Sequence, residues 1–189
     1  MNDDDNFKQL ILANRRECNG FWFWRDKPVG ERGIARNILE EAGIQVDGLS
    51  SRNEDPPDCE ATLDSHFSGI EVTELVHRPT LERSIKAVRQ RLRGEEPQKA
   101  EAYFVWQRED LITALQAMLI VKNSAKLKRS YERYVLVIHA DETFLDSENV
   151  ERFLKGASFD TSLITHAFLG LSYEPGKGYP VFPLELVRR

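Results

Sequence analysis

The chain has 189 residues, of which 41% are hydrophobic and 30% charged, and its formal net charge is −5 at pH 7. This length fits a single domain over residues 1–189 with room for a core, and the acidic balance argues against a protein that coats itself with nucleic acid, although it leaves room for a local basic groove. Two cysteines are too few for a disulfide framework, no apolar run approaches the roughly 20 residues of a membrane span, and the acidic N-terminus does not resemble a targeting signal. We therefore expect a cytoplasmic protein with no membrane contact.

The first half of the chain predicts two helices followed by a hairpin. A short helix is predicted over 7–17, and the aromatic run at 21–24 is interpreted as a core or cap segment rather than a stacking surface for bases. A helix with an apolar stripe is predicted over 30–46, with a glycine near its end in the position of a C′ residue. After a polar loop, 59–63 and 69–76 are predicted to be the two strands of the hairpin.

The second half of the chain alternates helices and strands. An amphipathic helix is predicted over 79–94 and a longer helix over 108–133. The continuous apolar run at 134–139 is typical of a strand that is buried on both faces. A short helix over 147–156 and a C-terminal strand pair over 166–187 complete the order. This order favours an α/β fold with a mixed central sheet flanked by helices.

The hairpin brings two carboxylates together if it turns at Asp64 and Ser65. Asp58 then lies opposite Glu71, and Cβ atoms of such a pair are about 4.5–5.5 Å apart. Two carboxylates at this distance repel each other unless one is protonated or a cation lies between them. Mg²⁺, which prefers oxygen ligands, is the natural cation. Two alternatives stay open: a longer turn shifts the register, or both acids are solvated on an exposed face.

The run PPD, followed after a short strand by GIEVTEL, resembles the PD-(D/E)XK nuclease superfamily, whose fold is called restriction-endonuclease-like. The resemblance extends over residues 31–140. It implies a nuclease that depends on Mg²⁺ or Mn²⁺ and cleaves phosphodiester bonds, in DNA rather than RNA. In that pattern Asp58 and Glu71 bind the metal, and the carbonyl of Val72 completes its shell. Glu31 matches the acid that the preceding helix supplies, with two later glutamates of that helix as alternatives.

The sequence departs from this pattern at Thr73, where the family usually has a lysine. That lysine is thought to help activate water and to offset charge on the transition state, and a threonine hydroxyl carries no charge. Because some members of the superfamily place this cation on a neighbouring helix, Lys122 and Lys126 are the candidates to replace it. Gln107, just before their helix, is a candidate polar contact.

Two groups of basic residues are predicted to follow a phosphate backbone. The first has helical spacing within the predicted helix 108–133 and consists of Lys122, Lys126, Arg129 and Arg133. The second lies opposite the apolar side of the predicted helix 79–94 and consists of Arg83, Lys86 and Arg93. A solvated cationic face is the alternative interpretation of either group.

Other functions remain compatible with the sequence. Because a threonine replaces the motif lysine, the alternative is a catalytically inactive module of the same fold that binds nucleic acid or a protein partner, for example in a toxin or phage-defence system. The resemblance also implies a homodimer. The four histidines do not have the spacing of zinc ligands, and neither a nucleophile elbow nor a phosphate-binding loop is present.

Overall fold

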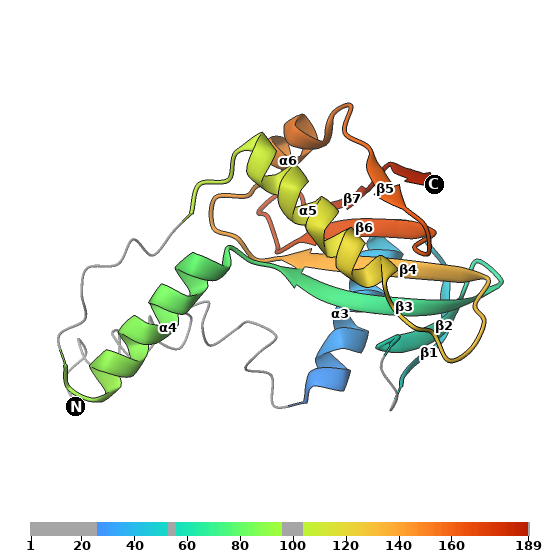
Figure 1. Cartoon of the computed structure of the whole chain (residues 1–189), viewed down its shortest axis with the longest axis horizontal. Coiled ribbons are helices and arrows are strands. Elements are labelled where there is room, and N and C mark those ends of the chain that lie inside the picture. The colour runs from blue at the N-terminus through green and yellow to red at the C-terminus, as the bar shows by residue number, and fades with distance from the viewer. Residues whose placement is uncertain (1–25, 53–55, 96–103, 189) are drawn as a thin grey trace.

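The computed structural model describes residues 26–52, 56–95 and 104–188, and in these ranges it is an α/β structure with a mixed six-stranded sheet (Figure 1). The helices are α3 (Lys27–Glu41), α4 (Arg78–Leu92), α5 (Arg108–Asn123) and α6 (Ser147–Leu154). The strands of the large sheet, in spatial order, are β1 (Val46–Ser51), β2 (Cys59–Leu63), β3 (His66–Leu75), β4 (Arg133–Ala140), β6 (His166–Leu171) and β7 (Val181–Pro183). A second sheet pairs β5 (Phe159–Thr161) with β8 (Leu186–Arg188). The predicted α/β architecture is confirmed.

The large sheet combines an antiparallel half with a parallel half. β1, β2 and β3 are antiparallel neighbours, β3, β4 and β6 are parallel, and β7 returns antiparallel to β6. The parallel pairs need crossover connections, and the chain between β3 and β4 contains α4 and α5. The strand pair β6–β7 matches the predicted C-terminal pair, although β8 leaves it to join β5.

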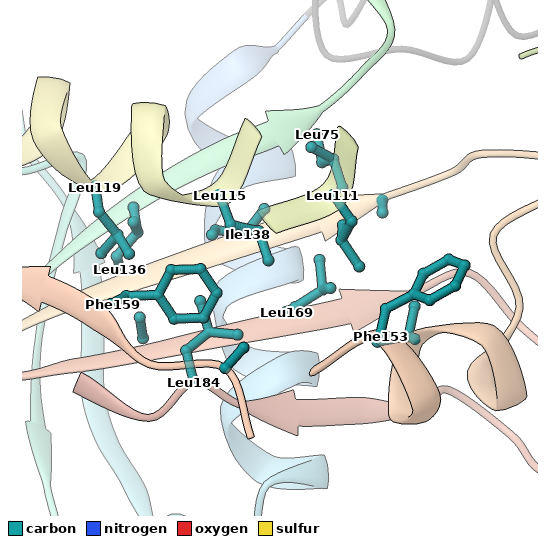
Figure 2. Close-up of a cluster of buried hydrophobic side chains, with 14 of the residues drawn as sticks. Leu75, Leu111, Leu115, Leu119, Leu136, Ile138, Phe153, Phe159, Leu169 and Leu184 are labelled. Atoms are coloured by element: carbon teal, nitrogen blue, oxygen red, sulfur yellow. The ribbon is translucent and has the colours of Figure 1, made fainter. Parts of the chain in front are cut away.

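Two hydrophobic clusters cover the two faces of the sheet, as expected for a central strand with alternating side chains. On one face, Leu111, Leu115 and Leu119 of α5 pack against Leu136 and Ile138 of β4 (Figure 2). On the other face, α3 packs against the remaining β4 side chains and the hairpin. The predicted burial of β4 on both faces is confirmed.

Helix α5 ends at Asn123 and not near residue 133, so this predicted boundary is wrong. The buried leucine spacing of α5 stops at Leu119, and Ile120 and Val121 of the last turn are exposed. At the end of the helix, Asn123 Oδ1 accepts hydrogen bonds from the backbone N–H groups of residues 162–164 and from the Thr161 hydroxyl. The chain then crosses to β4 without helical structure.

Strand β1 was not expected from the sequence. The predicted helix ends as its glycine indicated, because Gly43 adopts φ 78°. The next residues form an edge strand whose pairing with β2 is interrupted between Asp47 and Ser50, around Gly48 at φ 65°. This irregularity breaks the alternation by which a strand is recognised. The elements predicted at 7–17 and 21–24 lie outside the described residues.

The sheet opens beside β3 at the point where β2 begins. The last ladder pair between these strands joins Cys59 to Ile70, while β3 continues beside β4 to Leu75. Residues from both helical layers can therefore reach the backbone of β3 at this fork. None of the helices in the described ranges combines the length and apolar character that a bilayer crossing requires.

Candidate active site at the fork of the sheet

The register of the hairpin is the predicted one. Its ladder runs from Cys59 opposite Ile70 to the turn at Asp64 and Ser65, whose φ angles are 45° and 70°. Continuing this register by one residue places Asp58 opposite Glu71. The Asp58 carboxylate accepts a hydrogen bond from the backbone N–H of Val72 at 2.8 Å. This bond holds the aspartate beside the part of β3 that follows its last pair with β2.

Glu71 is a buried carboxylate, with only 3% of its surface exposed. One of its oxygens accepts from the ammonium group of Lys122, and the other accepts from the hydroxyl of Tyr134 at 3.1 Å. Burial and the neighbouring charge of Asp58 raise the pKa of Glu71, while Lys122 and Tyr134 oppose this rise. The net result is a carboxyl group whose pKa lies above its usual value, so one cation from the chain only partly compensates for the environment.

Glu31 approaches the same fork from the other helical layer. It is on α3, is 6% exposed and forms an ion pair with Lys27 at 2.9 Å. Glu31 lines the same pocket as Val72 and Lys122. The pKa of the buried Cys59 thiol rises to about 12 because of burial and then because of the charges of Asp58 and Glu31. Asp58 and Glu71 are therefore neighbours where β2 begins, and Glu31 faces the adjoining pocket from α3.

A pocket of about 830 Å³ opens beside these acids, between the end of β3, the start of α3 and the last turns of α5. Its apolar side is formed by residues of α5, namely Ala114, Ala117, Met118 and Val121. Its polar residues are Lys27, Glu31, Thr73, Glu74, Arg78 and Lys122. The predicted positions Thr73, Val72 and Lys122 thus share one pocket, and Lys122 bridges it to the buried Glu71.

The first basic group does not form a single helical stripe, and this interpretation is wrong. Only Lys122 lies on α5. Lys126 is an exposed residue beyond the helix. Arg129 forms an ion pair with Glu60 at 3.1 Å and Arg133 forms one with Asp64 at 3.5 Å. Because α5 ends early, these two arginines pair with acids of the hairpin and its turn and do not lie at the fork.

In the second basic group, Arg83 and Lys86 lie on α4 and Arg93 directly follows it. This helix begins at the pocket and extends away from the sheet (Figure 1). The side chains of Arg83, Lys86 and Arg93 are exposed. Gln107 is the residue that caps the start of α5 and donates its backbone N–H to Asp110 at 3.0 Å. A helix of this length separates Gln107 from Lys122 by about 22 Å, so Gln107 is not a contact of the pocket.

Three residues of the site were missed from the sequence: Lys27, Arg78 and Tyr134. The spacing of Lys27 and Glu31, four apart on one helix, was a usable signal for an ion pair. Tyr134 begins a buried strand, where a tyrosine hydroxyl needs a partner, but the sequence does not name that partner. Arg78 reaches the pocket because α4 starts next to the end of β3.

The oxygen atoms at the fork fit the ligand preference of Mg²⁺ or Mn²⁺. The carboxylates of Asp58 and Glu71 lie in adjacent strand positions, and a main-chain carbonyl such as that of Val72 is the same kind of hard donor. In the ranges that the structure describes, no group of three or more His, Cys, Asp or Glu side chains has the arrangement of a metal site. Because Lys122 and Tyr134 already donate to the two oxygens of Glu71, a divalent ion at Glu71 would compete with Lys122 for the carboxylate.

The chain was compared with protein-family models, curated proteins and solved structures. No significant match was found in any of the three comparisons.

Proposed function

We propose that this protein is a metal-dependent nuclease with a restriction-endonuclease-like arrangement of its site, acting on DNA in preference to RNA. The observation that supports this most is the pair of Lys122 and Glu71, next to Asp58. In the nuclease superfamily that this sequence resembles, a lysine two residues after the glutamate usually supplies the cation. Here Thr73 occupies that position, and a lysine of α5 reaches the same glutamate from above the sheet.

The proposed division of labour follows from the geometry. Asp58, Glu71 and the Val72 carbonyl would hold Mg²⁺ or Mn²⁺, and Glu31 would hold the ion or a water on it. When bound, such an ion lowers the pKa of a water and offsets charge on the scissile phosphate. The ammonium group of Lys122 lies at the wall of the pocket. After this group has left Glu71, it would stabilise negative charge on the phosphate. Thr73 offers a hydroxyl donor in the same pocket.

A second candidate function is a binding module without catalysis. It is favoured by the fact that both oxygens of Glu71 already have donors within the chain. This module would bind nucleic acid or a protein partner, as in a toxin or phage-defence system, without any divalent ion. Like the proposed nuclease, this module would act in the cytoplasm. We also propose that the protein forms homodimers, which sedimentation velocity at assay concentrations would detect.

The deciding experiment measures cleavage of a supercoiled plasmid and of a circular single strand with Mg²⁺ or Mn²⁺. We expect Asp58→Asn, Glu71→Gln and Lys122→Met each to lower the rate by about 100-fold or more, because each removes charge from the reacting centre. Glu40→Gln is the matched control, since it removes one exposed carboxylate from α3. Nucleic-acid binding that is unaffected by EDTA, without cleavage of either substrate, would instead identify the binding module.

A further inference from the structure

The pocket beside Glu71 has two chemically different sides. The α5 side presents methyl, thioether and isopropyl groups from Ala117, Met118 and Val121. Ala117 and Val121 are exposed, Val121 to 65%, whereas Met118 also packs against the core. The remaining lining carries the cations Lys27, Arg78 and Lys122 together with the acids Glu31, which is paired with Lys27, and Glu74. A ligand that fits both sides must have a flat or apolar part and a negatively charged part.

A nucleotide has these two parts. Its base can pack on the apolar wall of α5, since every base has a π-face that stacks on or contacts apolar side chains. Its phosphates can be bound by the ammonium and guanidinium groups, Arg being suited to bidentate contacts with phosphate. Glu74 also lines the pocket, and a carboxylate accepts hydrogen bonds from the exocyclic amino groups of bases but repels phosphate.

The size of the pocket sets a limit on the ligand. About 830 Å³ lies within the range of roughly 300–1,000 Å³ that is typical of small-molecule sites. Such a hollow holds a nucleotide but not a double helix. A base in a duplex is stacked between its neighbours and would reach an enclosed wall only after being extruded, which costs a few kcal/mol.

We propose that this pocket receives an unpaired nucleotide, and that the substrate of the site is therefore single-stranded nucleic acid instead of an intact duplex. This inference rests on the proposed nuclease function and narrows its substrate. Lys27 and Arg78 bind the phosphates on either side of the nucleotide in the pocket, and the wall of α5 holds its base. The scissile phosphate is thereby presented to Lys122 and the fork.

The first test measures binding by fluorescence anisotropy in EDTA, so that no cleavage interferes. The probes are a labelled 12-nucleotide single strand and the same strand in a blunt duplex. We expect the wild-type protein to bind the single strand at least tenfold more tightly. With Mg²⁺ or Mn²⁺ added, the single strand is also expected to be cut at least tenfold faster than the duplex.

The second test places a charge in the pocket. Ala117→Glu fills part of the pocket and introduces repulsion towards phosphate, and we expect at least a tenfold loss of single-strand affinity. Thr113→Glu is the matched control, because it adds the same exposed side chain to the same helix, outside the pocket lining. We expect less than a twofold loss for this variant. Unchanged thermal unfolding midpoints show that both variants are folded.

The outcomes separate the two levels of the proposal. Equal binding and cutting of the single strand and the duplex, or equal losses in Ala117→Glu and Thr113→Glu, would overturn the pocket assignment and leave the nuclease function standing. Absence of both binding and cleavage for every nucleic acid would overturn the nuclease function itself, and the substrate inference with it.

Discussion

The environment of Glu71 is unfavourable for a charged carboxylate. Its carboxylate is removed from water and lies next to Asp58, and both effects raise its pKa. Lys122 and Tyr134 donate to it but do not restore the usual pKa. A core position that served packing alone would gain more from an apolar side chain, since buried charges stabilise a fold only when they are fully compensated.

Replacing Glu71 is therefore expected to stabilise the fold while abolishing the proposed activity. Because the folded-state pKa is raised, the wild-type protein loses stability as the pH rises through that pKa. Glu71→Gln carries no charge and lacks this loss. We expect its thermal unfolding midpoint to exceed that of the wild-type protein at pH 8. The difference should shrink as the pH falls below the ordinary glutamate pKa of about 4.3, where the carboxyl group becomes protonated in both states.

The control for this measurement is Glu40→Gln. In the wild-type protein the exposed Glu40 side chain forms an ion pair with Arg36 on the surface of α3. It should change the midpoint little at either pH. If the midpoint difference between Glu71→Gln and the wild-type protein did not grow with pH, the buried carboxylate would not be a source of instability.

The pairing of Asp58 and Glu71 was predictable from the sequence because it depends on local rules. A tight turn at Asp64 and Ser65 fixes the register, and strand alternation then fixes the face. The contact of Tyr134 with Glu71 depends on which strand becomes the parallel neighbour of β3. No local pattern specifies that choice, so this residue could not be assigned to the site in advance.

At the scale of elements, the position of α3 matters because this helix carries Glu31 to the fork. A close approach to β6 sets that position. A Cβ atom added at Gly170 would lie 2.5 Å from two side-chain carbons of Ile38. The glycine is thus required for helix α3 to lie flat on the sheet, which is the role of a small residue under a close contact.

We expect Gly170→Ala to destabilise the protein by about 1–3 kcal/mol, as overpacking generally does. In a double-mutant cycle measured by urea denaturation, the variant that carries both Gly170→Ala and Ile38→Ala should lose less unfolding free energy than the two single variants together. The reason is that truncation of Ile38 removes the clash with the added Cβ atom. Gly33→Ala, on the same helix with no neighbour within 4 Å, should be neutral or stabilising. Strict additivity of the two changes would show that the contact does not limit the approach of α3.

The helices of the sheet layers were predicted better than their ends. The leucine spacing identified α5 as a buried helix, but the polar segment after Asn123 has the composition of a continuing amphipathic helix. The helix nevertheless ends at Asn123, whose side-chain oxygen accepts hydrogen bonds from the backbone N–H groups of residues 162–164. Such a contact joins segments distant in sequence, and the spacing of charges beyond Asn123 does not reveal it.

At the scale of the whole molecule, α4 extends away from the sheet beside the pocket (Figure 1). The chain is acidic overall, so a projecting basic helix would be its locally attractive feature for a polyanion. Arg83 and Lys86 are exposed on this helix, and Arg93 is exposed directly after its end. Since Arg78 at its first position lines the pocket, a strand leaving the pocket would meet α4 next.

Replacing Arg83, Lys86 and Arg93 together by alanine should weaken binding of single strands of any sequence. It should also lower the steepness of log K against log salt concentration by up to about 2, because each phosphate contact on a single strand contributes about 0.7. Anisotropy titrations between about 50 and 200 mM salt measure both effects. The control is a variant with alanine at Arg36, Arg152 and Lys177, three cations that lie outside α4. An equal slope in both variants would exclude α4 from the path of the strand.

The order of the site residues along the chain has a consequence for synthesis on the ribosome. The three acids lie before residue 72, whereas Lys122 and Tyr134 come from α5 and β4. A nascent chain that has released only the hairpin would carry adjacent carboxylates with neither donor available. Their repulsion would oppose early closure of the fork until the later segments emerge, so the site would be assembled together with the parallel half of the sheet.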